Sequence, residues 1–176
     1  SFQPDIIVIT CMFSQTHQSL IDIINIIRTE HNIPIAIGGV HVTGSISNEI
    51  TCKKFLKDVK GVDFIFLNES EVSFREFIKY LNFRNNEEKL TQFIAIDGNK
   101  LIKFDERLTP TGEDLNIIPN HKKMYSGEVA KVGKIGGFFS LVPKSKKLST
   151  ILSNRGCRAQ CTFCSVRNFN GVGVRR

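Results

Sequence analysis

The sequence lacks the features that would place the chain in a membrane or on a secretory route. Its longest apolar runs, DIIVIT and IPIAIGGV, fall far short of the roughly 20 residues that a bilayer-spanning helix needs. No basic segment followed by an apolar stretch opens the chain, so nothing indicates a secretion signal. Five cysteines in 176 residues are an odd number and too sparse for a secreted disulfide scaffold. We therefore expect a reducing, cytoplasmic setting.

The composition is that of an ordinary globular protein, with 41% hydrophobic and 23% charged residues. The length suffices for one domain and part of another. The formal net charge of +7 can indicate an anionic partner such as nucleic acid. Many of the lysines, however, lie in residues 122–147, which have the composition of a solvated linker. We therefore regard a nucleic-acid partner as the less favoured interpretation.

The first hundred residues alternate between strand-like and helix-like hydrophobic patterns. Apolar runs at residues 5–10, 33–39 and 62–68 predict three strands, the first of them buried on both faces. Apolar residues at helical spacing follow each run. They are Leu20, Ile23, Ile24 and Ile27, then a weaker pattern over 46–56, then Phe74, Phe77, Ile78 and Leu81. This alternation predicts a parallel α/β sheet with helices on both faces.

Caps and a hairpin complete this reading of the first part. Ser14 or Thr16 is expected to cap the first helix, and Asn68 with Glu71 can form a capping box for the third. Residues 91–104 hold two strand-like runs around an Asp-Gly pair, which predicts a β-hairpin at an antiparallel edge of the sheet.

The remainder of the sequence divides into a linker and the beginning of a second domain. Residues 105–147 have no sustained period, and LSTILSN at 148–154 predicts one more strand that runs directly into a cysteine cluster. A single strand cannot form a domain, because its faces need partners. The chain also opens on a predicted strand without an initiator methionine. We therefore expect a fragment with a domain at 1–104, the linker at 105–147 and a truncated second domain at 148–176.

The cysteine cluster is the strongest chemical signal in the sequence. Cys157, Cys161 and Cys164 have the spacing C-x3-C-x2-C. A disulfide leaves one of the three unpaired, and a structural zinc site would need a fourth ligand from Cys11, Cys52 or a distant histidine. Three thiolates on a loop can instead hold three irons of a [4Fe–4S] cluster and leave the fourth iron open. An open metal position is usual in catalytic sites, so we favour the cluster.

The string GCRAQCTFC resembles the cluster loop of the radical S-adenosylmethionine (SAM) enzymes, in which an aromatic residue precedes the last cysteine, here Phe163. The flanking LSTILSN and NGVGVRR resemble that family's first barrel strand and the stretch after its loop. The resemblance implies that the three cysteines bind a [4Fe–4S] cluster, whose open iron chelates SAM, and that Phe163 contacts SAM. It implies reductive cleavage of SAM to a 5′-deoxyadenosyl radical, with an electron donor such as flavodoxin or ferredoxin.

The family's fold is a partial TIM-like barrel, and a barrel of this kind needs on the order of 200 residues. Only about 30 residues remain from Leu148 to the end of the chain. The later SAM-binding segments of the family would therefore be absent. We expect the fragment by itself to be catalytically incompetent.

The first part resembles the cobalamin-binding, Rossmann-like domain that precedes the barrel in one branch of the radical SAM enzymes. PDIIVIT, IPIAIGGVHVT and VDFIFLNESE match its PD-strand, its Gly-Gly-x-His turn and its Gly-Glu-Gly-Glu-like turn in that order. Here the last turn keeps both glutamates, Glu69 and Glu71, and loses both glycines. EDLNIIPN at 113–120 resembles the segment that leads to the barrel.

This resemblance implies a cobalamin site at the carboxyl ends of the strands, where ligands of open parallel sheets bind. Thr10, Gly38, Gly39 and Glu69 are the expected contacts, because glycines let a flat macrocycle approach the backbone. Alternatively, the two glycines only end a strand and the Asn-Glu-Ser-Glu turn only caps a helix. His41 is more often structural or solvated than a metal ligand. No Asp-x-His-x-x-Gly string is present, and some members of the branch keep the domain without cobalamin.

Two other functions stay open at this stage. A methylthiotransferase acting on tRNA or ribosomal protein would need three further cysteines for a second cluster, but only Cys11 and Cys52 are available. These two are better explained as small buried hydrophobic residues. A non-enzymatic zinc-binding module is the other alternative. For a cobalamin-type enzyme, methyl transfer to an unactivated carbon and radical rearrangement both fit, and the substrate is not predicted.

Overall fold

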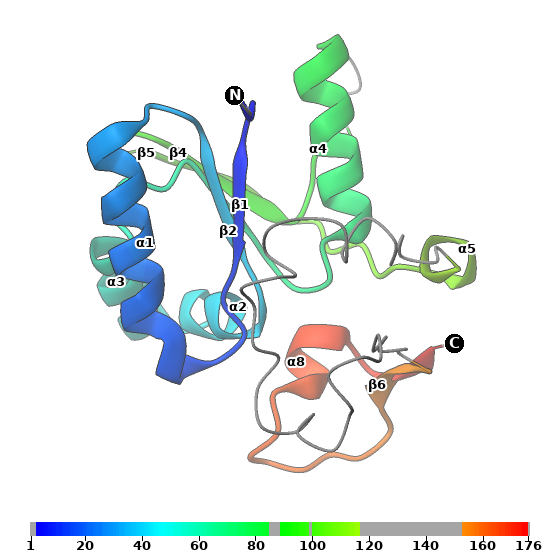
Figure 1. Cartoon of the computed structure of the whole chain (residues 1–176). Helices are drawn as coiled ribbons and strands as arrows, with labels where there is room; N and C mark the ends of the chain where they lie inside the picture. Colours follow the sequence, from blue (N-terminus) through cyan, green and yellow to red (C-terminus); the bar gives the residue numbers. More distant parts are fainter. Residues whose placement is uncertain (1–2, 85–88, 99, 117–152, 176) are drawn as a thin grey trace, which may run out of the picture.

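A computed structural model of the chain describes residues 3–84, 89–98, 100–116 and 153–175. The first part is an α/β unit built around one five-stranded sheet (Figure 1). The strands are, in sheet order, β1 (Ile7–Thr10), β2 (Ile35–Gly38), β3 (Phe64–Phe66), β4 (Phe93–Asp97) and β5 (Lys100–Phe104). The first three are parallel, and the β4–β5 hairpin joins β3 in antiparallel orientation. The predicted α/β class and the hairpin at one edge are confirmed.

One face of the sheet packs against α1 (His17–Glu30) and α3 (Glu49–Asp58). α1 begins directly after a short 3-10 helix, η1 (Ser14–Thr16). Each aliphatic or aromatic side chain buried here stabilises the fold by about 1.5–3 kcal/mol. The most deeply buried members of this layer include Leu20, Ile24, Ile37, Phe55 and Ile65.

The other face packs against α4 (Glu71–Phe83) through an aromatic cluster. Phe66 stacks on Phe93 of the neighbouring strand with ring centroids 5.2 Å apart, and Phe77 of α4 meets Phe66 edge to face at 5.3 Å. The four apolar residues that predicted α4 all belong to this cluster. Aromatic pairs of this geometry add about 0.5–1.5 kcal/mol beyond the area they bury.

β1 is not buried on both faces, contrary to the prediction from its apolar run. Val8 is 54% exposed, and β1 is the outermost of the described strands in the sheet order. The α4 layer covers β3 and β4, so within the described residues one face of β1 is left partly open. A continuous apolar run gives no information about which face a helix will cover.

The predicted capping box of Asn68 and Glu71 is not formed. α4 begins at Glu71 with Ser70 as its N-cap, and the Ser70 hydroxyl donates to the Leu67 carbonyl instead of accepting from the helix. Asn68 lies outside the helix in a left-handed conformation with φ of 57°. Thr16 is the N-cap of α1, as one of the two predicted candidates, but its hydroxyl also donates to a preceding carbonyl.

A short helix, α2 (Val40–Ile46), occupies the region that the sequence suggested was a turn after the Gly-Gly pair. Its N-cap is Gly39, whose φ is +112°, and a Cβ at this position would lie 2.5 Å from the Cys11 carbonyl oxygen. Gly39 is therefore required by the close crossing of two backbones. The weaker helical pattern further on is confirmed as α3, which Asn48 caps by accepting from the backbone N–H of Ile50 at 2.9 Å.

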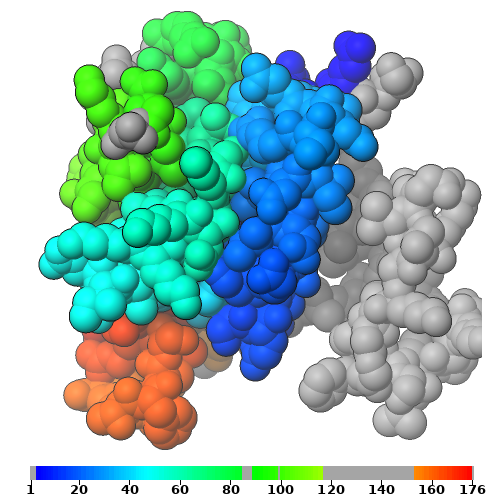
Figure 2. All heavy atoms as spheres, turned by 90° about the vertical axis from the view of Figure 1, so that its left-hand side faces the viewer, coloured from blue at the N-terminus to red at the C-terminus, as the bar shows by residue number. Residues whose placement is uncertain are grey.

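The three clustered cysteines lie in a small unit at the carboxyl-end edge of the sheet. It consists of β6 (Arg155–Cys157), α8 (Val166–Asn170) and β7 (Gly173–Arg175), and the two strands pair in antiparallel orientation. α8 contacts α2, and Figure 2 shows the orange end of the chain directly below the cyan residues. Gly156 adopts a φ of +83°, and a side chain there would collide with the Gly173 carbonyl.

The predicted strand at 148–154 falls largely outside the described residues, and so does the linker from 117 to 147. The described start of that linker contains one short helix, α5 (Gly112–Leu115), with a capping box between Thr111 and Asp114. Of the helices described, none is both long enough and apolar enough to cross a membrane.

Candidate functional site

The carboxyl ends of β1, β2 and β3 surround a cavity of about 540 Å³. All four residues predicted as cobalamin contacts line it: Thr10, Gly38, Gly39 and Glu69. The parallel register brings them together, because Thr10 at the end of β1 is the direct partner of Gly38 at the end of β2. Glu69 follows the end of β3. The convergence of these residues is a finding, whereas the identity of the ligand stays a prediction.

The wall of the cavity is mainly apolar. Val8 and Met12 contribute from β1 and the loop after it, and they are 54% and 46% exposed. Phe74 of α4 and Phe169 of α8 contribute aromatic rings. Half-exposed apolar side chains around a concavity are typical of a site for a small organic molecule or cofactor.

The polar rim of the cavity is formed by the Asn-Glu-Ser-Glu turn. The Asn68 backbone N–H donates to the Thr43 hydroxyl at 2.8 Å, which ties the turn to α2. From behind, the buried Gln92 side chain donates to the carbonyls of Leu67 and Glu69, at 2.7 and 2.8 Å. A residue of α2 and the residue just before β4 therefore hold this turn at the cavity.

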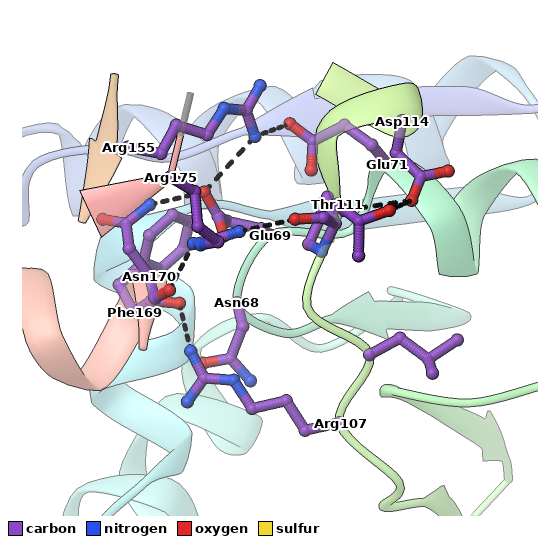
Figure 3. A network of polar contacts seen from close by, with 12 residues as sticks. Asn68, Glu69, Glu71, Arg107, Thr111, Asp114, Arg155, Phe169, Asn170 and Arg175 are labelled. Carbon is purple, nitrogen blue, oxygen red and sulfur yellow. Dashed lines mark hydrogen bonds and ion pairs between the residues drawn. The ribbon is translucent and has the colours of Figure 1, made fainter. Parts of the chain in front are cut away.

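Glu69 has a side chain that is only 4% exposed. Its carboxylate accepts hydrogen bonds from Arg155 at 3.3 Å, from the Asn170 side-chain amide at 2.7 Å, and from Arg175 (Figure 3). A buried carboxylate is tolerated when it is paired and its lone pairs are satisfied. Sequence reasoning predicted Glu69 at the cavity but did not predict these partners.

Glu71, two residues after Glu69 and the first residue of α4, forms a second ion pair with Arg155. Burial lowers the pKa of the Arg155 guanidinium, but the hydrogen bond and the charge of Glu71, together with Glu69, outweigh it and raise the pKa above its usual value. The arginine therefore carries its positive charge at any physiological pH. Its charge lies between two carboxylates of the first α/β unit (described residues 3–104), which we call the front domain.

Two further arginine contacts link the parts of the chain. Arg107, beyond the hairpin, donates to the backbone carbonyls of Asn168 and Phe169 at 3.1 and 2.7 Å. Arg175 also donates to the Pro110 carbonyl at 3.0 Å. Neither arginine was a candidate in the sequence, because an isolated arginine gives no local signal of a long-range partner.

The cysteine loop projects from the β6–β7 ribbon and carries accessible thiols. Cys157 is half-buried, Cys161 and Cys164 are exposed, and all three are free. The Ala159 N–H points at the Cys157 sulfur at 3.4 Å. Phe163, the predicted SAM contact, is 91% exposed.

The three thiols share one loop but are not brought together around a common point. In the part of the chain that the structure describes, no group of three His, Cys, Asp or Glu side chains is placed to hold a metal ion. The donor set itself fits an iron–sulfur centre: three free thiols, reachable from solvent, at short spacing on one loop. The ligand assignment therefore stays a prediction that the chemistry of the loop supports.

The two remaining cysteines lie in the front domain. Cys11 is buried directly after β1, with its sulfur 3.4 Å from the Thr16 hydroxyl oxygen. Cys52 is half-buried on α3. Cys11 therefore has the environment that we predicted for a small buried residue, whereas Cys52 is only partly buried.

His41 belongs to a chain of polar groups away from the cavity lining. Its Nε2 lies 3.1 Å from Nδ1 of His17, and Nε2 of His17 lies 3.2 Å from a carboxylate oxygen of Asp58. Burial, and secondarily the neighbouring His17, lower the pKa of His41. His41 links α2 to α1 and α3, which agrees with the structural interpretation of this residue.

Comparison with known proteins points to methyltransferases. No protein-family model matches the sequence. The chain is 25% identical over 198 residues to cytidylyl-2-hydroxyethylphosphonate methyltransferase of Streptomyces wedmorensis. That alignment covers 99% of the chain and 35% of the relative, so the chain spans about a third of the relative's length.

Among solved structures, there is a partial likeness to the radical S-adenosylmethionine methyltransferase TsrM from Kitasatospora setae, determined with tryptophan substrate and a SAM analogue bound. The TM-score is 0.44 at 14% sequence identity, over 59% of this chain and 20% of that chain.

Proposed function

We propose that this chain is part of a radical SAM methyltransferase, with a cofactor cavity in the front domain and a cluster-binding loop beside it. The observation that carries the proposal is the shared location of the two sites. Arg155 and Asn170, which flank the cysteine loop, line the same cavity as the four predicted contact residues. Two features inferred separately from the sequence therefore meet at one edge of one sheet.

The curated relative supports methyl transfer over radical rearrangement. It is named as a methyltransferase, and its alignment extends over nearly the whole chain, including the region of the cysteines. Because the chain spans only about a third of that relative, the substrate and the complete reaction belong to the proposal and not to the findings.

In this proposal Cys157, Cys161 and Cys164 hold a [4Fe–4S] cluster. When bound, the cluster supplies the electron for reductive cleavage of SAM. The exposed Phe163 ring, next to the last cysteine, is available to pack against the adenosyl part of SAM. The ribbon of β6 and β7 holds both ends of the loop in place.

The front cavity would bind the corrin ring of cobalamin as the methyl carrier. The half-exposed Val8 and Met12 side chains offer an apolar surface, and Thr10 with the Asn-Glu-Ser-Glu turn offers polar contacts at the rim.

Anaerobic reconstitution with iron and sulfide tests the cluster. We expect a brown protein with about four iron and four sulfide per chain. Cys161→Ser should lose most of the iron, whereas Cys52→Ser, the matched control on α3, should keep it. A colourless protein with one zinc per chain would contradict the proposal and favour the zinc module, and twice the expected iron would favour the methylthiotransferase.

Titration with methylcobalamin, followed by its visible absorbance, tests the cavity. Val8→Trp should fill the apolar wall and weaken binding roughly tenfold, which corresponds to about 1.4 kcal/mol. Ile26→Trp is the matched control, because Ile26 is 61% exposed on α1 and does not line the cavity. Equal affinity of both variants and the parent chain would rule out this cavity as the cobalamin site.

A further inference from the structure

The buried Glu69 carboxylate depends on a distant part of the chain. Its three side-chain partners among the described residues, Arg155, Asn170 and Arg175, all come from the cysteine-bearing unit. Removing the partners of a buried charge is strongly destabilising, because the charge is then left unpaired in a poorly solvated site. Glu69 therefore stabilises the docked position of that unit against the front domain.

The two arginines also need Glu69. Arg155 in β6 and Arg175 in β7 are direct register partners in the antiparallel ribbon. Like charges directly opposite each other in a sheet are destabilising. One oxygen of the Glu69 carboxylate accepts from Arg155 and the other accepts from Arg175, so this anion bridges the two strands. Together with Glu71, which also pairs with Arg155, it balances the two positive charges.

This ribbon is the base of the cysteine loop. Cys157 is the last residue of β6, two positions after Arg155, and β7 returns after α8. Opening the ribbon at Arg155 and Arg175 would therefore free the loop at both ends. Glu71 adds a second, half-exposed carboxylate to Arg155.

We propose that Glu69, supported by Glu71, is a positioning residue that clamps the base of the cysteine loop at the mouth of the cavity. Figure 3 shows the arginines of the ribbon converging on this turn. The inference rests on the proposed function for its catalytic meaning. In that setting the clamp keeps the cluster and the ligand of the cavity facing each other. The clamp itself concerns only side chains of this chain and can be tested without any cofactor.

Hydrogen exchange of the cofactor-free chain, followed by mass spectrometry, tests the clamp. Glu69→Gln removes the charge with little change of shape, so Arg155 and Arg175 are left to repel each other. We expect amide exchange in β6 and β7 to accelerate about tenfold or more, with little change in α1 and β2. Exchange within twofold of the parent chain in β6 and β7 would overturn the proposal.

The matched control is Glu76→Gln. Glu76 lies on α4 and, like Glu69, is largely buried, with its side chain 10% exposed. Its ion pairs, however, are with Arg75 and Lys79 of the same helix. This variant should leave β6 and β7 protected. Equally fast amide exchange in β6 and β7 in both variants would indicate general destabilisation and would count against a specific clamp.

A double variant separates positioning from general stability. Adding Arg155→Gln to Glu69→Gln removes one of the two repelling charges, so the ribbon should recover part of its protection. If both substitutions only destabilised the ribbon, amide exchange in β6 and β7 would be faster in the double variant than in Glu69→Gln. Absence of any recovery would contradict charge neutralisation across the ribbon.

A cluster-based measurement then tests the catalytic meaning. In the reconstituted protein, with cobalamin added in saturating amount, Glu69→Gln should retain iron but weaken the magnetic interaction between the reduced cluster and cob(II)alamin, as seen by electron paramagnetic resonance. An unchanged interaction would show that the clamp does not set the distance and orientation between the cluster and the ligand of the cavity. Loss of hydrogen-exchange protection together with failure to bind iron in the parent chain would sustain the clamp and reject the proposed function.

Discussion

At the level of single residues, Glu69 in the Asn-Glu-Ser-Glu turn has partners that the sequence around it does not predict. The position of Glu69 at the end of β3 was predicted from the strand pattern and from the family resemblance. Its partners Arg155 and Arg175 lie 86 and 106 positions away. Gln92, which supports the turn, gave no sequence signal, because a glutamine next to a strand is usually solvated.

His41 provides a residue-level prediction about pH. Its pKa is lowered in the folded chain by burial and by His17, so the unfolded chain binds the proton more tightly. The neutral form therefore stabilises the fold fully above the ordinary pKa of 6.5, and this contribution is lost as the pH falls below that value. Denaturant titrations should show a falling unfolding free energy on acidification below pH 6.5.

A matched pair of variants tests this assignment. His41→Gln should flatten the pH dependence of stability below pH 6.5, because the titrating group is gone. His31→Gln, at the exposed C-cap of α1, should leave the slope unchanged. An identical slope in the parent chain and His41→Gln would refute the assignment. His17 and Asp58, which form the rest of the hydrogen-bonded chain, stay in place in both variants.

At the level of elements, the short helix α2 after β2 was not predicted by the hydrophobic pattern. Seven residues are too few for a reliable helical period, and Gly-Gly suggested only an end to the strand. The structure assigns the two glycines different roles. Gly39 is required by its left-handed φ and its contact with β1, whereas Gly38 lines the cavity with an ordinary φ.

Two glycines near α2 give an element-level prediction. Gly39→Ala should lower the free energy of unfolding by about 1–3 kcal/mol, because it combines a strained backbone with a collision at the Cys11 carbonyl. Gly44→Ala, on the exposed side of α2 with open space around it, should raise stability by about 0.5–1 kcal/mol. Urea denaturation measures both, and equal effects of the two substitutions would contradict the described backbone.

At the level of the whole molecule, the five-stranded sheet and the cysteine-bearing unit are packed together and line one common cavity. The cavity takes its floor from the strand ends and part of its rim from Arg155 and Asn170. Ligands of open α/β sheets bind at this edge. In the proposed function, the unit docked there would lie beside the bound ligand. The remaining two thirds of the curated relative's length have no counterpart in this chain.

The sequence by itself determined the α/β class, the hairpin, the residues at the strand ends and the cysteine spacing. Each of these is local: it depends on hydrophobic period, on turn chemistry or on spacing within a few residues. Only the tertiary structure decided which face of β1 is open, that α2 exists and that Glu69 joins Arg155 and Arg175. These features depend on contacts between segments far apart in the chain, and no local pattern encodes the partner of a buried charge.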